Sequence, residues 1–368
     1  MEEPPIRLIG TNERILDHID LDKLYKIEVS GVTIKHNAKL TSSEIANLWT
    51  TYQYSTMIIC GVEYFLRTVE DEEILKILHY ILDFSTNRIQ SISEIMHGDN
   101  YPLPVGFTKS DVNPDAPRLF SDAMVLLYIL NMGRLSLSGE SMMFSLSARD
   151  DVAGFYSQAL NESEELTTMS RKLAQEKGIY TRTPHIPIPE KADFVKKQQF
   201  LFGWFGDRRP LVGTEILNLV FNAERNALGE ALITGFSQVA QSKKVRKFME
   251  RGREISSKHY EVFSSILNEE DLSSSQKITS EVSESTTAPF SDKLMMFHIA
   301  GLVASGIGQY GVSVSVSPRR DLEVHYARLV GELAKFAEDG ANIMIENGWM
   351  EEPPKAADRD ELMKRKGN

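Results

Sequence analysis

Hydrophobic side chains recur along several long segments of the chain with the period of an α-helix. In one segment the apolar positions are Val245, Phe248, Met249, Ile255, Val262, Phe263 and Ile266. An earlier segment repeats the pattern with Ile74, Ile77, Leu78, Ile81, Phe84, Ile92 and Ile95. A spacing near 3.6 residues is typical of an amphipathic helix with one buried face. Both segments are therefore predicted to be helices of a packed bundle.

The second half of the chain repeats the first half at an offset of about 170 residues, which indicates an internal duplication. The matching segments are Leu40–Leu48 with Leu211–Leu219, Phe120–Asp122 with Phe290–Asp292, Ser145–Tyr156 with Ser315–Tyr326, and Gly178 with Gly348. A register held over so long a stretch indicates two copies of one fold. It also allows each candidate site in one copy to be compared with its counterpart in the other.

Each copy contains four helical patterns and one long loop. The loop is rich in Pro and Asp at residues 98–117 and rich in Ser and Thr at residues 268–289. Such segments are too long for a hairpin between antiparallel helices, but they can run the full height of a bundle, as in ferritin-like folds. We predict an all-α protein of two tandem ferritin-like four-helix bundles, each with a long crossover between helices 2 and 3.

These patterns predict four regions. They are an N-terminal arm (1–39), a first four-helix bundle (40–198), an aromatic interdomain linker (199–210) and a second bundle with a C-terminal tail (211–368). In the arm, Lys26–Lys35 alternates apolar and polar residues, which suits either a small β-hairpin or an extended segment. The linker contains Phe200, Phe202, Trp204 and Phe205. We expect these rings to be buried between the bundles; the alternative is a patch that binds a partner.

The predicted helix ends carry recognisable residue types. Thr41, Thr214, Asp151 and Asp321 are predicted to cap the helices that follow them. The third helix of each copy ends in the motif Ser-x-Ser-x-Arg-x-Asp. We interpret this motif as structural, with its arginine pairing with a carboxylate or with free carbonyl groups. Gly178 and Gly348 are predicted to stop the fourth helices.

Composition narrows the functional classes. The net charge of -11 argues against sequence-independent binding of nucleic acid, which needs clustered Lys and Arg. The single cysteine, Cys60, excludes an intrachain disulfide framework and favours a reducing compartment, so a cytoplasmic location is expected. Residues 294–318 lack charged side chains and are long enough to cross a membrane. Their counterpart contains Arg134 and Glu140, however, so we expect buried bundle helices and no membrane span.

Several segments resemble an uncharacterised family from spore-forming bacteria. They are Phe194–Gln198, Gly203–Pro210 and Phe290–Phe297. That family, a domain of unknown function, consists of tandem ferritin-like four-helix domains and is described as similar to spore coat protein F. The resemblance extends over residues 40–360 and leaves the first 39 residues outside. It implies the fold and a link to sporulation, and it implies no activity.

A ferritin-like di-metal site needs a carboxylate from each of two helices and Glu-x-x-His from each of the other two. The chain contains one Glu-x-x-His, Glu94–His97, directly before Gly98. There His97 is explained by the macrodipole at a helix C-terminus. The standard di-iron constellation is therefore absent from the sequence.

Another polar set occurs in the second copy alone. Glu224, His259 and His325 lie in apolar stripes of three helices, within ~7 Å of one height in a ferritin-like bundle. His298 is a weaker candidate. Their counterparts in the first copy are Gln53, Arg88, Phe155 and Tyr128. Two imidazoles and a carboxylate would suit zinc or iron; the alternative is a hydrogen-bonded cluster without metal.

Two functional hypotheses follow. The first is a structural or interaction protein linked to sporulation, located in the cytoplasm or the spore coat, with protein partners or a homo-oligomer. It has no catalytic residues and no certain cofactor. The second is a metal-binding ferritin-like protein with a mononuclear Glu/His site in the second bundle, acting as a weak oxidoreductase. Loss of the Glu/His set in the first copy favours the structural hypothesis.

Overall fold

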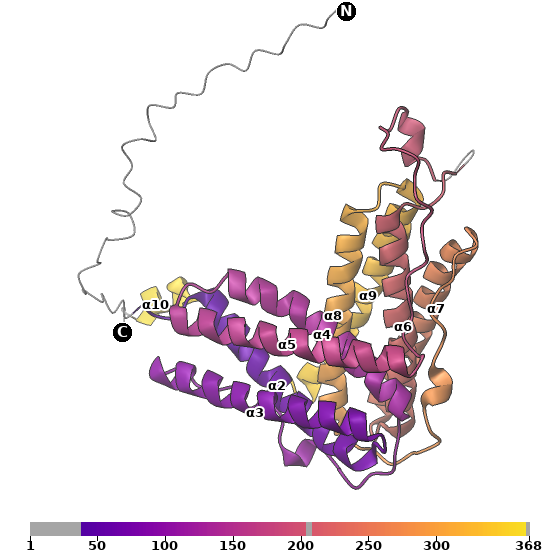
Figure 1. Ribbon diagram of the computed structural model, residues 1–368. Helices are drawn as coiled ribbons and strands as arrows, with labels where there is room; N and C mark the ends of the chain where they lie inside the picture. The colour runs from indigo at the N-terminus through magenta and orange to yellow at the C-terminus, as the bar shows by residue number, and fades with distance from the viewer. Residues whose placement is uncertain (1–37, 204–207, 366–368) are drawn as a thin grey trace, which may run out of the picture. The chain divides into compact units, whose positions relative to one another are not determined.

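The structure is a computed structural model that describes residues 38–203 and 208–365. The chain divides into two units, Met1–Lys39 and Leu40–Asn368. Nearly all of the first unit lies outside the described residues, and so does the hairpin predicted at Lys26–Lys35. The second unit contains both repeats (Figure 1).

Each repeat contains four long helices. The helices of the first repeat are α2 (Ser42–Thr68), α3 (Glu72–Gly98), α4 (Asp122–Ser145) and α5 (Asp150–Glu176). Those of the second are α6 (Gly213–Val239), α7 (Lys243–Asn268), α8 (Asp292–Ser315) and α9 (Arg320–Glu346). The shorter elements are η2 (Lys109–Asp111), η3 (Gln198–Leu201), η4 (Thr279–Glu281) and α10 (Arg359–Arg365). The described residues form no extended strand, and the predicted all-α class is confirmed. The exact domain boundaries stay predictions.

Contacts at the helix ends establish the topology of the first repeat. The carboxylate of Asp122, which begins α4, accepts hydrogen bonds from the backbone N–H groups of Glu70 and Asp71, in the turn between α2 and α3. Glu44, in the first turn of α2, accepts from the N–H of Arg149, which precedes α5. Helix α4 therefore runs antiparallel to α2 and in the same direction as α3. The loop between α3 and α4 spans the height of the bundle, as predicted.

The second repeat has the same topology. Asp292 at the start of α8 accepts hydrogen bonds from the N–H groups of Gln241 and Ser242. Glu215 in the first turn of α6 accepts from the N–H of Arg319, which precedes α9. In each repeat the first and fourth helices both pack against the second and third. This pattern is the square arrangement expected of a bundle with a long crossover.

The two crossover loops pair with each other reciprocally. Val112 forms an isolated antiparallel bridge with Phe290, and its counterpart Val282 forms one with Phe120. The backbone hydrogen bonds follow the same rule: Ser291 N–H to Asp111 C=O (3.0 Å), Ser121 N–H to Glu281 C=O (3.0 Å), Asn113 N–H to Pro289 C=O (2.8 Å) and Ser283 N–H to Leu119 C=O (2.9 Å). Each contact therefore occurs twice, with the roles of the two repeats swapped, as in an isologous interface. The repeats are therefore related by a pseudo-two-fold axis.

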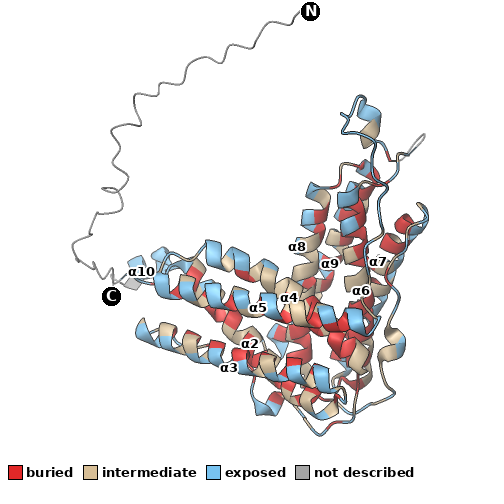
Figure 2. Ribbon diagram, viewed as in Figure 1, coloured by how far each residue is buried: buried red, intermediate tan, exposed pale blue. Residues whose placement is uncertain are grey.

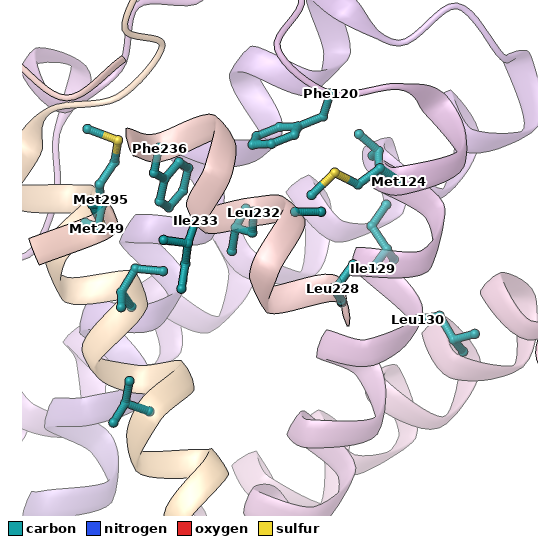
Figure 3. Close-up of a cluster of buried hydrophobic side chains, with 14 of the residues drawn as sticks. Phe120, Met124, Ile129, Leu130, Leu228, Leu232, Ile233, Phe236, Met249 and Met295 are labelled. Atoms are coloured by element: carbon teal, nitrogen blue, oxygen red, sulfur yellow. The ribbon is translucent and has the colours of Figure 1, made fainter. Parts of the chain in front are cut away.

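One hydrophobic cluster extends through both repeats. Figure 3 shows Phe120, Met124 and Ile129 of the first repeat near Leu228, Leu232 and Phe236 of the second, and all belong to this cluster. Buried positions lie along the inward faces of the helices, as the burial colours show (Figure 2). A smaller cluster in the first repeat comprises Leu40, Leu48, Trp49, Ile92, Met96, Val152, Tyr156 and Ala159. The main core is thus shared between the repeats.

Some predicted helix ends are confirmed. Thr41 forms a capping box with Glu44, because each backbone N–H donates to the other residue's side chain. Gly178 and Gly348 follow α5 and α9 with φ angles of 70° and 67°. This left-handed conformation costs glycine little, because it has no Cβ, and it closes the helix C-terminus.

Other predicted caps are wrong. Helix α6 is capped at Val212, one residue before its start, so Thr214 lies inside the helix. Asp151 and Asp321 also lie inside their helices, whose N-caps are Arg149 and Arg319. The physical reason is that each carboxylate is held by the arginine two residues before it, and Arg319 binds Asp321 at 2.9 Å.

The arginine of the Ser-x-Ser-x-Arg-x-Asp motif is a structural residue, as predicted. Arg319 is 1% exposed and bridges Asp321 to Glu270, beside the C-terminus of α7, at 3.0 Å. Arg149 similarly contacts Asp151 and Asp99. The motif therefore joins the start of the fourth helix to the end of the second in both repeats.

The expected burial of the aromatic linker between the bundles is wrong for its described residues. Phe202 is 41% exposed. The ring of Phe200 lies 4.0 Å from the guanidinium of Arg209, a neighbour on the same linker. The crossover loops and the shared core already occupy the interface between the repeats. Trp204 and Phe205 lie outside the described residues.

The charge-free segment forms α8, which packs against α6 and α9. None of the helices among the described residues is long and apolar enough to span a membrane.

Candidate functional site

A buried polar group lies at the centre of the second repeat. The His259 side chain, on α7, is fully buried. Its Nδ1 is 3.0 Å from the hydroxyl of Tyr310 on α8, and its Nε2 is 3.2 Å from Oε2 of Glu332 on α9. Lys258 also donates to Glu332 at 2.7 Å. Three helices thus converge on one imidazole.

The hydrogen bonds assign the proton positions in this group. Asn226 Nδ2 donates to the Tyr310 hydroxyl at 2.8 Å, so the tyrosine proton is directed to His259 Nδ1. The carboxylate of Glu332 can only accept, so His259 donates from Nε2. Burial lowers the pKa of His259 to about 4 and outweighs the opposing effect of Glu332. The imidazole is therefore neutral at pH 7.

The first repeat buries a charged group at the equivalent position. The guanidinium of Arg88, on α3, is 2.8 Å from Glu140 Oε1 on α4 and 2.8 Å from Glu162 Oε2 on α5. It also donates to the backbone carbonyl of Ala159 at 2.9 Å. In the register of the duplication, Arg88, Glu140 and Glu162 correspond to His259, Tyr310 and Glu332. We call these two sets the central triads.

The central triads differ in charge but share one construction. In each, a side chain from the second helix lies between one residue of the third helix and a glutamate of the fourth. Burial raises the pKa of Glu140, although the neighbouring Arg88 opposes this. The pKa of Glu332 is lowered: burial raises it, but its bonds to Lys258 and His259 prevail. Each triad therefore joins three helices of its own repeat through buried polar contacts.

The structure separates the three residues predicted as metal ligands. Glu224 lies on the face of α6 toward the first repeat, and its Oε1 is 3.0 Å from Arg134. His259 belongs to the central triad, and His325 is half-buried on α9 near Asp321. In residues 38–203 and 208–365, no three or more His, Cys, Asp or Glu side chains are grouped to hold a metal ion. Metal binding by Glu224, His259 and His325 therefore stays a prediction that these contacts do not support.

Two further candidates have structural partners. His298 Nε2 is 2.9 Å from the hydroxyl of Tyr128, which is its own counterpart in the other repeat. Burial lowers the pKa of His298 to about 4. Cys60 is buried, and burial raises the pKa of its thiol to about 12. Such a thiol is a poor nucleophile.

Sequence reasoning missed Tyr310, Glu332, Glu140 and Glu162. The information was present in the duplication, because the counterpart of His259 is Arg88. A buried arginine requires acceptors, and the glutamates at matching positions of the fourth helices were available. Comparing the two copies position by position would have found both triads.

Stability should depend on pH through the two buried histidines. Their pKa is about 4 in the folded protein and 6.5 when unperturbed, so the unfolded chain binds more protons below pH 6.5. The stability contributed by this shift is complete above pH 6.5 and is lost as the pH falls toward 4, by about 3 kcal/mol per histidine. We expect His259→Gln to reduce that loss, measured as the free energy of unfolding in urea from pH 7 to pH 4.

The control for this experiment is His79→Gln, which changes an exposed histidine. It should keep the pH dependence of the wild type. If His259→Gln also keeps that dependence, the imidazole is not held neutral by the fold.

No curated protein matches this chain. Among solved structures, a candidate spore coat protein of Bacillus halodurans is similar at 21% sequence identity and a TM-score of 0.36. The similarity covers 42% of this chain and 98% of that one. The family match covers most of the chain and includes residues 30–39, so the resemblance begins earlier than predicted. With two consecutive matches, at residues 30–192 and 199–362, the chain belongs to the family described as a protein of unknown function (DUF3231).

Proposed function

We propose that the protein is a structural or interaction protein in which both bundles serve as a scaffold. The observation that carries this proposal is that both central triads are closed by partners from the chain itself. Arg88 is held by two glutamates, and His259 is held by a phenol and a carboxylate. A catalytic group must reach its substrate, whereas His259 is 0% exposed. These polar residues thus serve to fix the helices relative to each other.

The surface supports a role in interactions. Met142 and Leu146, at the C-terminal end of α4, are 66% and 51% exposed. Their counterparts at the end of α8, Val312 and Val316, are 55% and 40% exposed. Apolar side chains exposed at the same place in both repeats are typical of a contact surface. Protein partners, or further copies of this chain, would cover them.

The proposal includes a role in sporulation. It rests on the resemblance of Phe194–Gln198, Gly203–Pro210 and Phe290–Phe297 to a family of spore-forming bacteria. A fluorescent fusion expressed in a spore-forming bacterium should accumulate in the sporulating cell, either in its cytoplasm or around the forming spore. Accumulation in vegetative cells alone would contradict this part of the proposal.

Metal analysis separates the scaffold from the metal-binding alternative. We expect protein purified without a histidine tag to contain negligible zinc and iron, and the variant His259→Ala with His325→Ala to contain the same amount. The measurement is elemental analysis by mass spectrometry. About one metal ion per wild-type chain that is lost in the double variant would overturn the scaffold proposal and establish a site such as those of mononuclear metal proteins.

A further inference from the structure

A cavity of about 80 Å³ lies where α4 of the first repeat meets α6 and α8 of the second. Its apolar wall includes Leu232, Ile299 and Val303, and its polar wall includes Arg225 and Asn131. Leu232 belongs to the group of α6 side chains shown in Figure 3. The cavity thus has one charged side and one hydrocarbon side.

Arg225 is a partly buried cation without an acidic partner among residues 38–203 and 208–365. Its guanidinium donates to Ser305 Oγ at 2.9 Å and lies 5.6 Å from the ring centre of Phe221. Burial lowers its pKa, yet an arginine remains charged at neutral pH. Two buried arginines, Arg88 and Arg319, each bind two carboxylates. An unpaired buried charge is costly, and an anion in the cavity would remove that cost.

One amide at the cavity also lacks a partner. Asn131 is 5% exposed, and its side chain forms no hydrogen bond within the described part of the chain. Asn222 also lines the cavity, but its Nδ2 already donates to Ser313 Oγ at 2.9 Å, so it does not favour an anion there. Buried amides are normally satisfied by hydrogen bonds. A hydrogen-bond acceptor at the Arg225 end of the cavity would satisfy the N–H groups of the Asn131 amide.

The pseudo-two-fold axis relates the cavity to an equivalent location, where α8 of the second repeat meets α2 of the first. There the counterpart of Arg225 is Tyr54 and the counterpart of Asn131 is Gly301. Tyr54 packs its ring directly against Gly301 and lies 5.3 Å from the ring of Phe297. An aromatic side chain thus fills on one side the position that carries the guanidinium on the other. The guanidinium of Arg225 and the amide of Asn131 therefore occur together at the cavity and are both missing from the equivalent location.

We propose that this cavity binds a short-chain aliphatic carboxylate. The carboxylate accepts hydrogen bonds from Arg225 and Asn131, and the hydrocarbon chain lies against Leu232, Ile299 and Val303. A guanidinium pairs well with a carboxylate because its N–H groups match both oxygens. The volume is about half that of a cavity able to hold benzene, so it accommodates about two to four carbon atoms. This inference is independent of the scaffold proposal.

Isothermal titration calorimetry of the full chain with acetate, propionate and butyrate tests the inference. Ionic strength is held constant with sodium chloride, and octanoate serves as an anion that is too long. We expect saturable binding of at least one short acid and weaker binding of octanoate. Arg225→Gln should weaken binding at least tenfold, whereas Arg251→Gln, which changes an arginine on the surface of α7, should leave it unchanged.

A second variant keeps the charge and removes the space. Gly229 lines the cavity, and its counterpart in the first repeat is Ile58. We expect Gly229→Ile to abolish binding, and this variant decides the question if Arg225→Gln does not fold. The inference is overturned if no short carboxylate binds the wild type, or if binding survives in folded Arg225→Gln or Gly229→Ile.

Discussion

Replacing Arg88 by methionine is expected to lower the free energy of unfolding by about 3–5 kcal/mol, because it removes the cation and leaves its buried carboxylate partners unpaired. Glu140 and Glu162 would lose the guanidinium that lies 2.8 Å from each of them. The Glu140 side chain is only 8% exposed, so water cannot replace the lost partner. Urea denaturation measures the change, and Arg251→Met, at a half-exposed pair with Asp339, should cost less than about 1 kcal/mol.

The second repeat provides a rescue of the same site. Arg88→His together with Glu140→Tyr copies the triad of His259, Tyr310 and Glu332 into the first repeat. We expect the pair to be more stable than the sum of the single changes predicts, by about 1–3 kcal/mol, since coupled neighbours are not additive. If the free-energy changes of the two single variants simply add up in the double variant, the His and Tyr side chains do not interact in the first repeat as they do in the second.

Phe290→Ala is expected to cost about 3–5 kcal/mol and to destabilise both repeats together. Phe290 lies in the second repeat, yet its ring centre is 5.3 Å from that of Tyr64 and 6.4 Å from that of Phe65, both in the first. It is 5% exposed, so its removal leaves a cavity in the shared core. Calorimetry should show one transition for the wild type and one, at lower temperature, for the variant.

The matched control is Phe194→Ala, because Phe194 is 89% exposed. It should change the free energy of unfolding by less than about 0.5 kcal/mol, as is usual for surface positions. Two separate transitions in the Phe290→Ala protein, one of them at the wild-type temperature, would show that the repeats are stable independently.

The architecture was predictable because it depends on periodic features. The apolar positions of α3 and α7, such as Ile74 and Val245, are buried as their spacing indicated. The length of the connections likewise indicated the crossovers. The reciprocal pairing of those crossovers was not predictable, since Val112 and Phe290 lie in different repeats and their pairing leaves no local pattern in the sequence. Asp151 resembled a helix cap, but the nearby Arg149 holds its carboxylate.

The candidate site was harder to predict than the fold. His259 was correctly placed in the core, but its partners come from α8 and α9, far away in sequence. Glu224 was placed in the same core from its apolar neighbours. It instead meets Arg134, because α6 also packs against α4 of the other repeat. Periodicity identifies which face of a helix is buried, but it does not indicate which of two neighbouring bundles covers that face.

The bond between Tyr128 and His298 shows what a covalent duplication allows. In a homodimer with the same two-fold axis, both positions would hold the same side chain, because one gene encodes both subunits. With the two halves in one polypeptide, a mutation can change one side and leave the other intact. Tyr54 and Arg225 have diverged at another equivalent pair of positions. The tandem arrangement therefore allows a side chain to change in one repeat while its counterpart in the other stays the same. The two halves are also joined covalently, so they do not have to find each other as separate chains.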